Sequence, residues 1–439
     1  MSAHAEVRSM WEEQGMAAGA KKKGIPGGRE SLPPFDSCKP FSYMQDGDKN
    51  NNGNGSLTGG PGAAAPQPRR DTSAAVSSAY PTHVHDLKLI DEDLAYTTLP
   101  CGLRVCKLIT GTWQLSGGFG YDPARDPESA HEALAGCVER GFDTFDCSST
   151  FGEAERVVGG LRGAAPETAA KGVYMTRWAP VPGTKISKKV LDGVVEKACE
   201  RMRCGAIDVL QLHWWDYNDT KYVAALRHFA QHPKVHHVGL ANFDTVHLLK
   251  VCDRSKGGAG VPIALNEVLY NVVDRRAERK MQKYCKENDM PLIAYGALMG
   301  GLLTDRWLRA PEPSGEDLDT PALRKYKLDL NRWGTWAHFQ VLLEEMNVIA
   351  RRLHVSIADV ALRWVLQQDA VAAVVLGQRA GHPDGRSHVA DNMRVFTFEL
   401  NQMDYTHIKA AHKIPREQRG HHRQTAWDLA DVGDEFRKT

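Results

Sequence analysis

Residues 188–242 alternate two helical patterns with two apolar runs: KKVLDGVVEKACERM (188–202), IDVLQLHWW (207–215), YVAALRHFAQH (222–232) and KVHHVGLAN (234–242). The first pattern carries one apolar stripe, formed by Val190, Leu191, Val194, Val195, Ala198 and Met202. Such a stripe is typical of an amphipathic helix. The runs between the helices are apolar on both faces, as parallel strands covered on both sides must be. The stretch therefore predicts βαβ crossovers in a parallel sheet.

The same alternation extends over most of the chain. Six further apolar runs are LRVCKLITGTW (103–113), FDTFDCS (142–148), GVYMTRWA (172–179), PIALNEVL (262–269), MPLIAYGAL (290–298) and AVAAVVLG (370–377). Eight strands close a TIM barrel. An open doubly wound sheet is the alternative, but GTWQLSGGFGYD (111–122) lacks the G-x-G-x-x-G spacing which that fold places after its first strand. We therefore predict an α/β fold of the TIM (β/α)8 type.

Composition divides the chain into three parts. Residues 1–78 include KNNNGNGSLTGGPGAAAPQPRR (49–70) and are predicted to be a disordered low-complexity extension. A docking arm for a protein partner is the alternative for this extension. The barrel is expected over 79–414, with a hairpin at 87–102 closing its bottom and an inserted loop at 303–334 over its top. Residues 415–439 are expected to form a polar surface tail.

Charge and cysteine content exclude several classes of function. The chain has 55 Lys+Arg and 54 Asp+Glu, so its balanced charge argues against nucleic acid and anionic membranes as partners. No apolar run is long enough to span a bilayer. The nine scattered cysteines form no C-x-x-C pair, and no histidine pair has a cysteine or carboxylate at ligand spacing, so no metal site is predicted. We expect a reducing, cytoplasmic location, with organelle import as the alternative.

Polar or aromatic residues end nearly every predicted strand. They are Thr112, Trp113, Asp146, Arg177, Trp178, His213, Trp214, Asn242, Glu267, Tyr295, Gly377 and Arg379. In TIM barrels the carboxyl ends of the strands carry the active site. This asymmetry indicates a functional site at that end of the barrel.

Six stretches, in order over residues 95–412, resemble motifs of the aldo-keto reductase family. They are LITGTWQ (108–114), GFDTFDCSSTFGEAERVVG (141–159), DVLQLHWW (208–215), VHHVGLANF (235–243), ALNEVLYNVVDRR (264–276) and LIAYGALMGGLL (292–303). The resemblance implies a TIM barrel that binds NADP(H) and reduces small-molecule carbonyls. In the family, hydride leaves the nicotinamide and a tyrosine hydroxyl gives the proton. A lysine and an aspartate tune that tyrosine, while a histidine orients the carbonyl.

The resemblance places the family's aspartate at Asp146 and its histidine at His213. It places the tyrosine at Phe151, which has no proton to give, and the lysine at Arg177. Arginine keeps the charge but is larger and does not deprotonate. We therefore expect impaired carbonyl reduction. The alternative is a non-catalytic scaffold, accessory subunit or cofactor-sensing pseudoenzyme.

The family's cofactor positions also map onto this chain. The resemblance places the pair that holds the carboxamide at Ala241 and Asn242, the glutamine at Glu267 and the stacking ring at Tyr295. Further cofactor-binding candidates are Thr112, Gly377, Arg379 and Arg386 (the two arginines for a 2′-phosphate), and Asp391 and Asn392 (for adenine). Trp113, Trp178 and Trp214 either line a substrate pocket or pack under loops.

Overall fold

The computed structural model describes residues 92–117, 119–120, 122–123, 126–181, 183–252, 260–380, 382, 388–413 and 431–433. The predicted extension 1–78 lies outside the described residues. So do Arg386 and all of 415–439 except 431–433.

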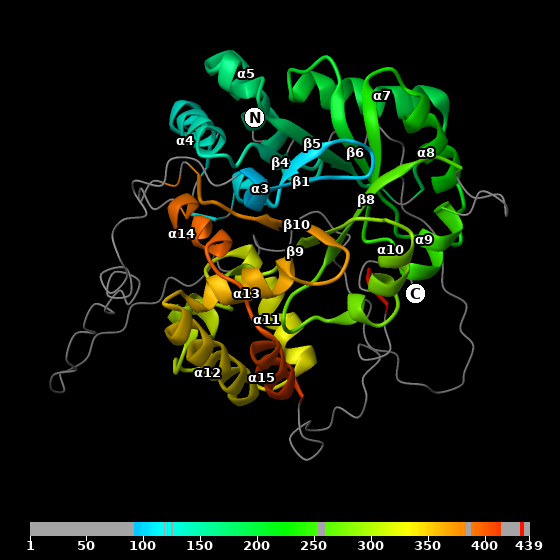
Figure 1. Cartoon of the computed structure of the whole chain (residues 1–439). Coiled ribbons are helices and arrows are strands. Elements are labelled where there is room, and N and C mark those ends of the chain that lie inside the picture. Colours follow the sequence, from blue (N-terminus) through cyan, green and yellow to red (C-terminus); the bar gives the residue numbers. More distant parts are fainter. Residues whose placement is uncertain are drawn as a thin grey trace, which may run out of the picture.

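Eight parallel strands form a closed barrel, which confirms the predicted TIM fold (Figure 1). Their bounds are β3 Leu108–Gly111, β4 Thr144–Asp146, β5 Val173–Trp178, β6 Ile207–His213, β7 Val235–Ala241, β8 Ile263–Leu269, β9 Leu292–Tyr295 and β10 Val371–Leu376. Neighbours in this order pair with one another, and β10 pairs with β3 to close the barrel. Each of the eight apolar runs contributes one barrel strand.

Helices surround the barrel (Figure 1). The α-helices are α3 Glu92–Ala95, α4 Pro127–Glu139, α5 Ala154–Ala164, α6 Pro166–Ala169, α7 Lys188–Arg201, α8 Tyr222–Gln231, α9 Thr245–Cys252, α10 Met281–Glu287, α11 Pro321–Trp333, α12 Trp336–Leu353, α13 Ile357–Leu366, α14 Val389–Met393 and α15 Gln402–His412. Short 3-10 helices are η2 Trp113–Ser116, η3 Arg276–Glu278, η4 Met299–Gly301, η5 Asp305–Trp307, η6 Gly315–Asp317 and η7 Arg394–Phe396. Among the described residues, no helix has the length and apolar character needed to cross a membrane.

A hairpin closes one end of the barrel, as predicted. It consists of β1 (Tyr96–Thr98) and β2 (Arg104–Cys106), which pair antiparallel. Leu99 and Val105 pack with the apolar side chains inside the barrel, including Ile109 and Val209. The hairpin occupies 96–106 rather than 87–102, because the apolar run that begins at residue 103 divides between β2 and β3.

The barrel interior changes from apolar to polar toward the carboxyl ends of the strands. Four strands contribute one buried apolar layer: Met175, Val209, Leu265 and Ile293. Two residues further along the same strands lie Arg177, Gln211, Glu267 and Tyr295. Because side chains alternate between the faces of a strand, these four also belong to the interior. This polar layer is where the candidate site begins.

The segment 303–334 contains helix α11 rather than only a loop. The side chain of Thr320 accepts a hydrogen bond from the Leu323 N–H and caps the helix, and Pro321 occupies its first turn. Leu323, Tyr326 and Leu330 form its buried side. A Cβ atom at Gly296 would lie 2.4 Å from the Tyr326 hydroxyl, so α11 packs tightly against the end of β9. The cap and the apolar spacing outweigh the polar composition from which a loop was predicted.

Candidate active site

The polar layer is held together by one arginine and one glutamine. Arg177 Nη2 donates to Asp146 Oδ2 at 3.2 Å and to Glu267 Oε1 at 2.7 Å. Gln211 Nε2 donates to the other oxygen of each carboxylate, Asp146 Oδ1 at 3.2 Å and Glu267 Oε2 at 2.9 Å. We call these four residues the carboxylate cluster. Its members come from β4, β5, β6 and β8, and every carboxylate oxygen in it accepts at least one hydrogen bond.

The carboxylate cluster places two buried carboxylates against a single cation. Burial raises the pKa of Asp146 well above its usual value, and the negative charge of Glu267 raises it further, although Arg177 opposes both effects. Burial by itself would lower the pKa of Arg177, but the charges of Glu267 and Asp146 outweigh it and raise that pKa. Arg177 therefore stays a cation, and burial together with the charge of Glu267 favours the protonated form of Asp146.

Phe151 lies beside this cluster, in the loop after β4. Its backbone N–H donates to the Ser148 carbonyl at 3.0 Å. Its ring stacks on Trp113 with the centroids 6.4 Å apart, and the Arg177 guanidinium carbon lies 5.7 Å from the Phe151 centroid. The structure thus brings Phe151, Arg177 and Asp146 together. A phenyl ring in this position offers the cation a π face but no proton.

His213 lies one step closer to the mouth of the barrel than the cluster. It follows Gln211 by two residues on β6 and therefore belongs to the same face of the strand. In the strand register His213 is opposite Ala241 of β7. Partly buried at the carboxyl end of β6, it occupies the level at which a ligand entering the barrel mouth would be contacted.

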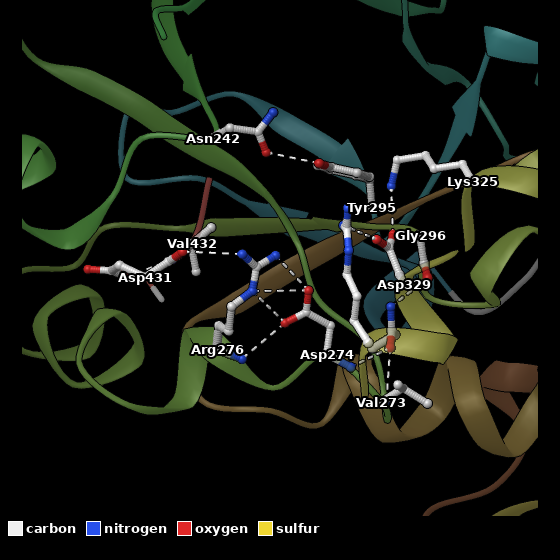
Figure 2. A network of polar contacts seen from close by, with 12 residues as sticks. Asn242, Val273, Asp274, Arg276, Tyr295, Gly296, Lys325, Asp329, Asp431 and Val432 are labelled. Atoms are coloured by element: carbon white, nitrogen blue, oxygen red, sulfur yellow. Dashed lines mark hydrogen bonds and ion pairs between the residues drawn. The ribbon is translucent and has the colours of Figure 1, made fainter. Parts of the chain in front are cut away.

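Asn242 and Tyr295 form a polar pair at the same mouth (Figure 2). The Tyr295 hydroxyl donates to Asn242 Oδ1 at 3.0 Å. Asn242 has a left-handed backbone with φ of 57°, and its N–H donates to the Glu267 carbonyl at 2.8 Å. With Oδ1 engaged, Asn242 Nδ2 is the group suited to donate to a carboxamide oxygen. An amide donor beside an aromatic ring fits a nicotinamide group.

Glu267 differs from what the sequence suggested for it. The resemblance counted it among the cofactor positions, but both of its carboxylate oxygens point into the carboxylate cluster, toward Arg177 and Gln211. Thr112 likewise binds protein, because its N–H and hydroxyl both donate to the Asp146 carbonyl, at 3.1 and 2.8 Å. These two residues hold strand ends together.

A second polar group surrounds the end of β10. A Cβ atom at Gly377 would lie 1.7 Å from Gln114 Nε2, and Gln114 Oε1 accepts from the Arg379 N–H at 2.9 Å. Gln378 Oε1 accepts from Asn392 Nδ2 at 2.6 Å, whereas Gln378 Nε2 is buried without a hydrogen-bond partner among the described residues. Gln114 and Gln378 also line a small pocket with Gly111. An unsatisfied donor beside a glycine is what a bound anion would use.

The charged candidates of this region already have protein partners. Arg379 Nη2 lies 3.0 Å from His382 Nδ1. Asp391 pairs with Arg394 at 2.9 Å, and its pKa is lowered, first by a hydrogen bond from His388. Gly377 and Asn392 thus lie close to Arg379, whereas the carboxylate of Asp391 is engaged by Arg394 of η7 and by His388.

The three tryptophans have different surroundings. Trp113 packs against Phe151 and Phe119, beside the cluster. Trp178 packs edge-on against Phe229 of α8, on the outer side of the barrel, because it alternates with the inward Arg177. Trp214 donates its Nε1–H to the carbonyls of Asp216 and Asp219 in the following loop. Trp113 is therefore the one of the three that lies beside Phe151.

Sequence reasoning missed Gln211, Gln114 and Gln378. Two-residue periodicity could have found Gln211, since His213 on the same strand was already a candidate. Gln114 and Gln378 follow strand ends, but neither was recognised as a partner of the other loop. Within the part of the chain that the structure describes, no three His, Cys, Asp or Glu side chains are grouped to hold a metal.

A closed parallel barrel with a polar layer at the carboxyl ends of its strands has the architecture of TIM-barrel enzymes. The family model for the aldo/keto reductase family matches residues 107–413, and the chain belongs to this family.

Curated relatives are distant in sequence. The L-glyceraldehyde 3-phosphate reductase of Escherichia coli (strain K12) is 25% identical over 320 residues, which cover 69% of this chain and 89% of that protein. The human aflatoxin B1 aldehyde reductase member 2 is 22% identical over 268 residues, covering 57% and 74%.

Solved structures share the fold. The glycerol dehydrogenase from Gluconobacter oxydans aligns with a TM-score of 0.57 at 21% identity, covering 72% of this chain and 95% of that one. An aldo/keto reductase from Klebsiella pneumoniae in complex with NADP and acetate aligns with a TM-score of 0.53 at 18% identity, covering 73% and 96%.

Proposed function

We propose that this protein is an NADP(H)-binding oxidoreductase of the aldo-keto reductase family in which carbonyl reduction is impaired. The observation that carries the proposal is the surroundings of Phe151. A ring without a hydroxyl lies 5.7 Å from the Arg177 guanidinium carbon, and the resemblance aligns this residue with the family's acid.

Cofactor binding is supported by the pair at the barrel mouth and by the end of β10. Asn242 would hold the carboxamide and Tyr295 would stack on the nicotinamide ring. Gln378 and Arg379 would face the phosphates from the loop that follows β10. The Klebsiella pneumoniae relative was solved in complex with NADP, and in a second structure with NADPH.

Reduction of a carbonyl requires a hydride at carbon and a proton at oxygen. The hydride is the chemistry that NADPH supplies when bound. The protein must provide the proton, and neither Phe151 nor Arg177 can do so. Asp146 is buried and engaged in the carboxylate cluster, so His213 at the barrel mouth is the member of the family's set that would relay a proton from water. We propose that substrates whose reduction needs no strong acid are the ones this site tolerates.

The carboxylate cluster also opposes the lowering of a phenol's pKa that the family's site relies on. In the family a cation favours the ionised tyrosine. Here the cation is shared between Asp146 and Glu267, so the cluster has no net positive charge that would stabilise a phenolate. This charge balance supports altered chemistry beyond the single loss of a hydroxyl.

The test measures binding and turnover separately. NADPH is titrated while tryptophan fluorescence is followed, and NADPH oxidation is then measured with a panel of aldehydes, ketones and quinones. We expect saturable binding and little or no reduction of simple aldehydes and ketones. Absence of binding would refute the cofactor part of the proposal, and rapid aldehyde reduction would refute the impaired chemistry.

A cofactor-sensing protein without turnover is the second candidate. It is favoured by the closed hydrogen bonding of the carboxylate cluster, in which Arg177 and Gln211 are both engaged by the same two carboxylates. The same experiment separates the candidates. Binding of NADPH with no oxidation by any member of the panel favours the sensor, whereas oxidation with quinones alone favours the enzyme.

A further inference from the structure

The short segment Asp431–Gly433 lies against the carboxyl ends of the barrel strands, although it was expected to be part of a surface tail. In Figure 1 it lies beside α9 and α10. Val432 is fully buried and belongs to the main hydrophobic core. The segment is therefore part of the packed structure.

The first anchor of this segment is the carboxylate of Asp431, which binds Thr245, the first residue of helix α9, beside the cap that Asp244 makes to the His247 N–H. Asp431 Oδ2 accepts from the Thr245 backbone N–H at 3.2 Å, and Oδ1 accepts from the Thr245 hydroxyl at 3.2 Å. A carboxylate at a helix N-terminus satisfies an unpaired N–H and interacts favourably with the helix dipole. Thr245 follows Asn242 by three residues, so this contact holds the start of α9 close to the candidate nicotinamide pair.

The second anchor is the backbone of Asp431. Its carbonyl accepts from Arg276 Nη1 at 3.3 Å. Arg276 is 2% exposed and is fixed by Asp274, whose carboxylate accepts from its Nε at 2.9 Å and its Nη2 at 2.7 Å (Figure 2). A buried guanidinium that is already oriented by a carboxylate is a rigid donor.

The third contact reaches Asn242 itself. Gly433 has φ of +81°, and a Cβ atom on it would lie 2.1 Å from the Asn242 carbonyl oxygen and 3.3 Å from Asn242 Cβ. Only glycine fits both this backbone conformation and this distance. The segment thus packs on the backbone of Asn242, while the side chain of Asn242 is engaged by Tyr295.

We propose that Asp431–Gly433 is a positioning segment of the cofactor site, which fixes the left-handed backbone of Asn242 so that its amide is oriented for the nicotinamide carboxamide. The inference rests on the proposed function, because it assigns the segment to NADP(H) binding. When Asn242 is already oriented in the free protein, less conformational entropy is lost on binding, and the affinity rises. The segment acts through Asn242 and needs no contact with the cofactor.

The test compares two ligands on full-length variants. Asp431→Ala removes the carboxylate that binds Thr245 at the start of α9, and Gly433→Ala forces the segment away from Asn242. We expect each to weaken NADPH binding roughly tenfold through lost pre-organisation. The affinity for adenosine 2′,5′-bisphosphate, which lacks the nicotinamide, should stay within a factor of two of the parent's. Asn401→Ala removes a helix cap elsewhere, that of α15, and should change neither affinity.

Equal weakening of both ligands would overturn the proposal, since it would show a general structural defect, and so would unchanged NADPH binding. A second measurement is independent of any cofactor. Amide hydrogen exchange over residues 242–248 of the ligand-free protein should accelerate in Asp431→Ala and not in Asn401→Ala. If the parent chain binds neither ligand, the proposed function fails. Unchanged exchange in Asp431→Ala would overturn the positioning role by itself.

Discussion

Arg177 binds Glu267 more closely than Asp146: its Nη2 lies 2.7 Å from Glu267 Oε1 and 3.2 Å from Asp146 Oδ2. This cation, which the resemblance aligns with the family's lysine, is thus shared between two carboxylates. The ring of Phe151, the residue that the resemblance aligns with the family's tyrosine, has its centroid 5.7 Å from the Arg177 guanidinium carbon. The site is therefore organised around a buried ion cluster.

Removing the cation should destabilise the fold strongly. Arg177→Met leaves two buried carboxylates without a counter-ion, and loss of one partner of a buried pair typically costs about 3–5 kcal/mol. Urea unfolding monitored by circular dichroism measures this change. Arg309→Met is the matched control, because the Arg309–Glu344 pair is just as short, at 2.6 Å, but exposed. If Arg177→Met lowers the free energy of unfolding no more than Arg309→Met does, the buried ion cluster is contradicted.

The raised pKa of Asp146 predicts a specific dependence of stability on pH. The unfolded carboxyl titrates near the usual value of about 3.9, and the folded one at a higher pH because of burial and Glu267. Between the two values the folded state binds more protons. Asp146 therefore contributes full stability below about pH 4 and loses that contribution as the pH rises through the folded pKa.

Asp146→Asn should remove this slope, which is at most about 1.4 kcal/mol per pH unit for one proton. The free energy of unfolding is measured from pH 5 to pH 9 for both proteins, and the slopes are compared rather than the absolute values. Asp192→Asn serves as the control, since the pKa of the half-buried Asp192 is lowered, first by a hydrogen bond from Lys188. An identical slope in Asp146→Asn and the parent protein would refute the assignment.

Restoring the family's tyrosine and lysine should not restore reduction. In Phe151→Tyr/Arg177→Lys, one ammonium would still face two buried carboxylates. Their negative charge opposes ionisation of the introduced phenol, so its pKa stays far above the working pH. A general acid contributes roughly 10²–10⁴-fold to a rate, and we expect a gain below about tenfold. Adding Glu267→Gln should raise the rate further, with Phe151→Leu as the inactive control. The rate of NADPH oxidation with aldehydes measures the effect. A hundredfold higher rate in the double variant would contradict the claim that the two carboxylates suppress acid catalysis.

Two cysteines at the end of α7 should differ in reactivity. The Arg203 N–H donates to the Glu200 carbonyl and the Cys204 N–H to the Cys199 carbonyl, which is the pattern of a Schellman cap. A hydrogen bond from Cys199 lowers the pKa of Cys204 despite its burial, and Arg162 lowers it further. The pKa of Cys199 is raised, first by that same hydrogen bond.

Iodoacetamide should therefore label Cys204 before Cys199, because the thiolate is the reactive form. Burial raises the pKa of Cys106, Cys137 and Cys285 to about 12, so these should stay unlabelled in the native protein. Mass spectrometry of peptides after short labelling measures the order. Arg162→Leu should slow the labelling of Cys204. Faster labelling of Cys199 than of Cys204 would contradict the assignment.

The sequence predicted the barrel well because each strand is an apolar run of its own. It also predicted that Asp146 and His213 lie at strand ends. What it could not predict is the hydrogen bonding between strands. The partners of Glu267 are Arg177 and Gln211, 90 and 56 residues away, and only the curvature of the closed barrel brings them together.

Helix α11 and the segment Asp431–Gly433 show the second limit. Both have polar compositions, from which a loop and a surface tail were predicted. The cap at Thr320 and the contacts of Asp431 with Thr245 and Arg276 depend on single side chains meeting at defined distances. Composition averages over such contacts, so it predicts neither of them.

We infer that the barrel binds NADPH but lacks the acid for carbonyl reduction. In a single-turnover experiment, the protein is saturated with NADPH, mixed rapidly with an excess of a reactive aldehyde, and followed by NADPH absorbance. We predict saturable NADPH binding, with aldehyde reduction no faster than in the protein-free mixture. Oxidation of the bound NADPH within seconds would contradict the claim, as would a failure to bind NADPH at all.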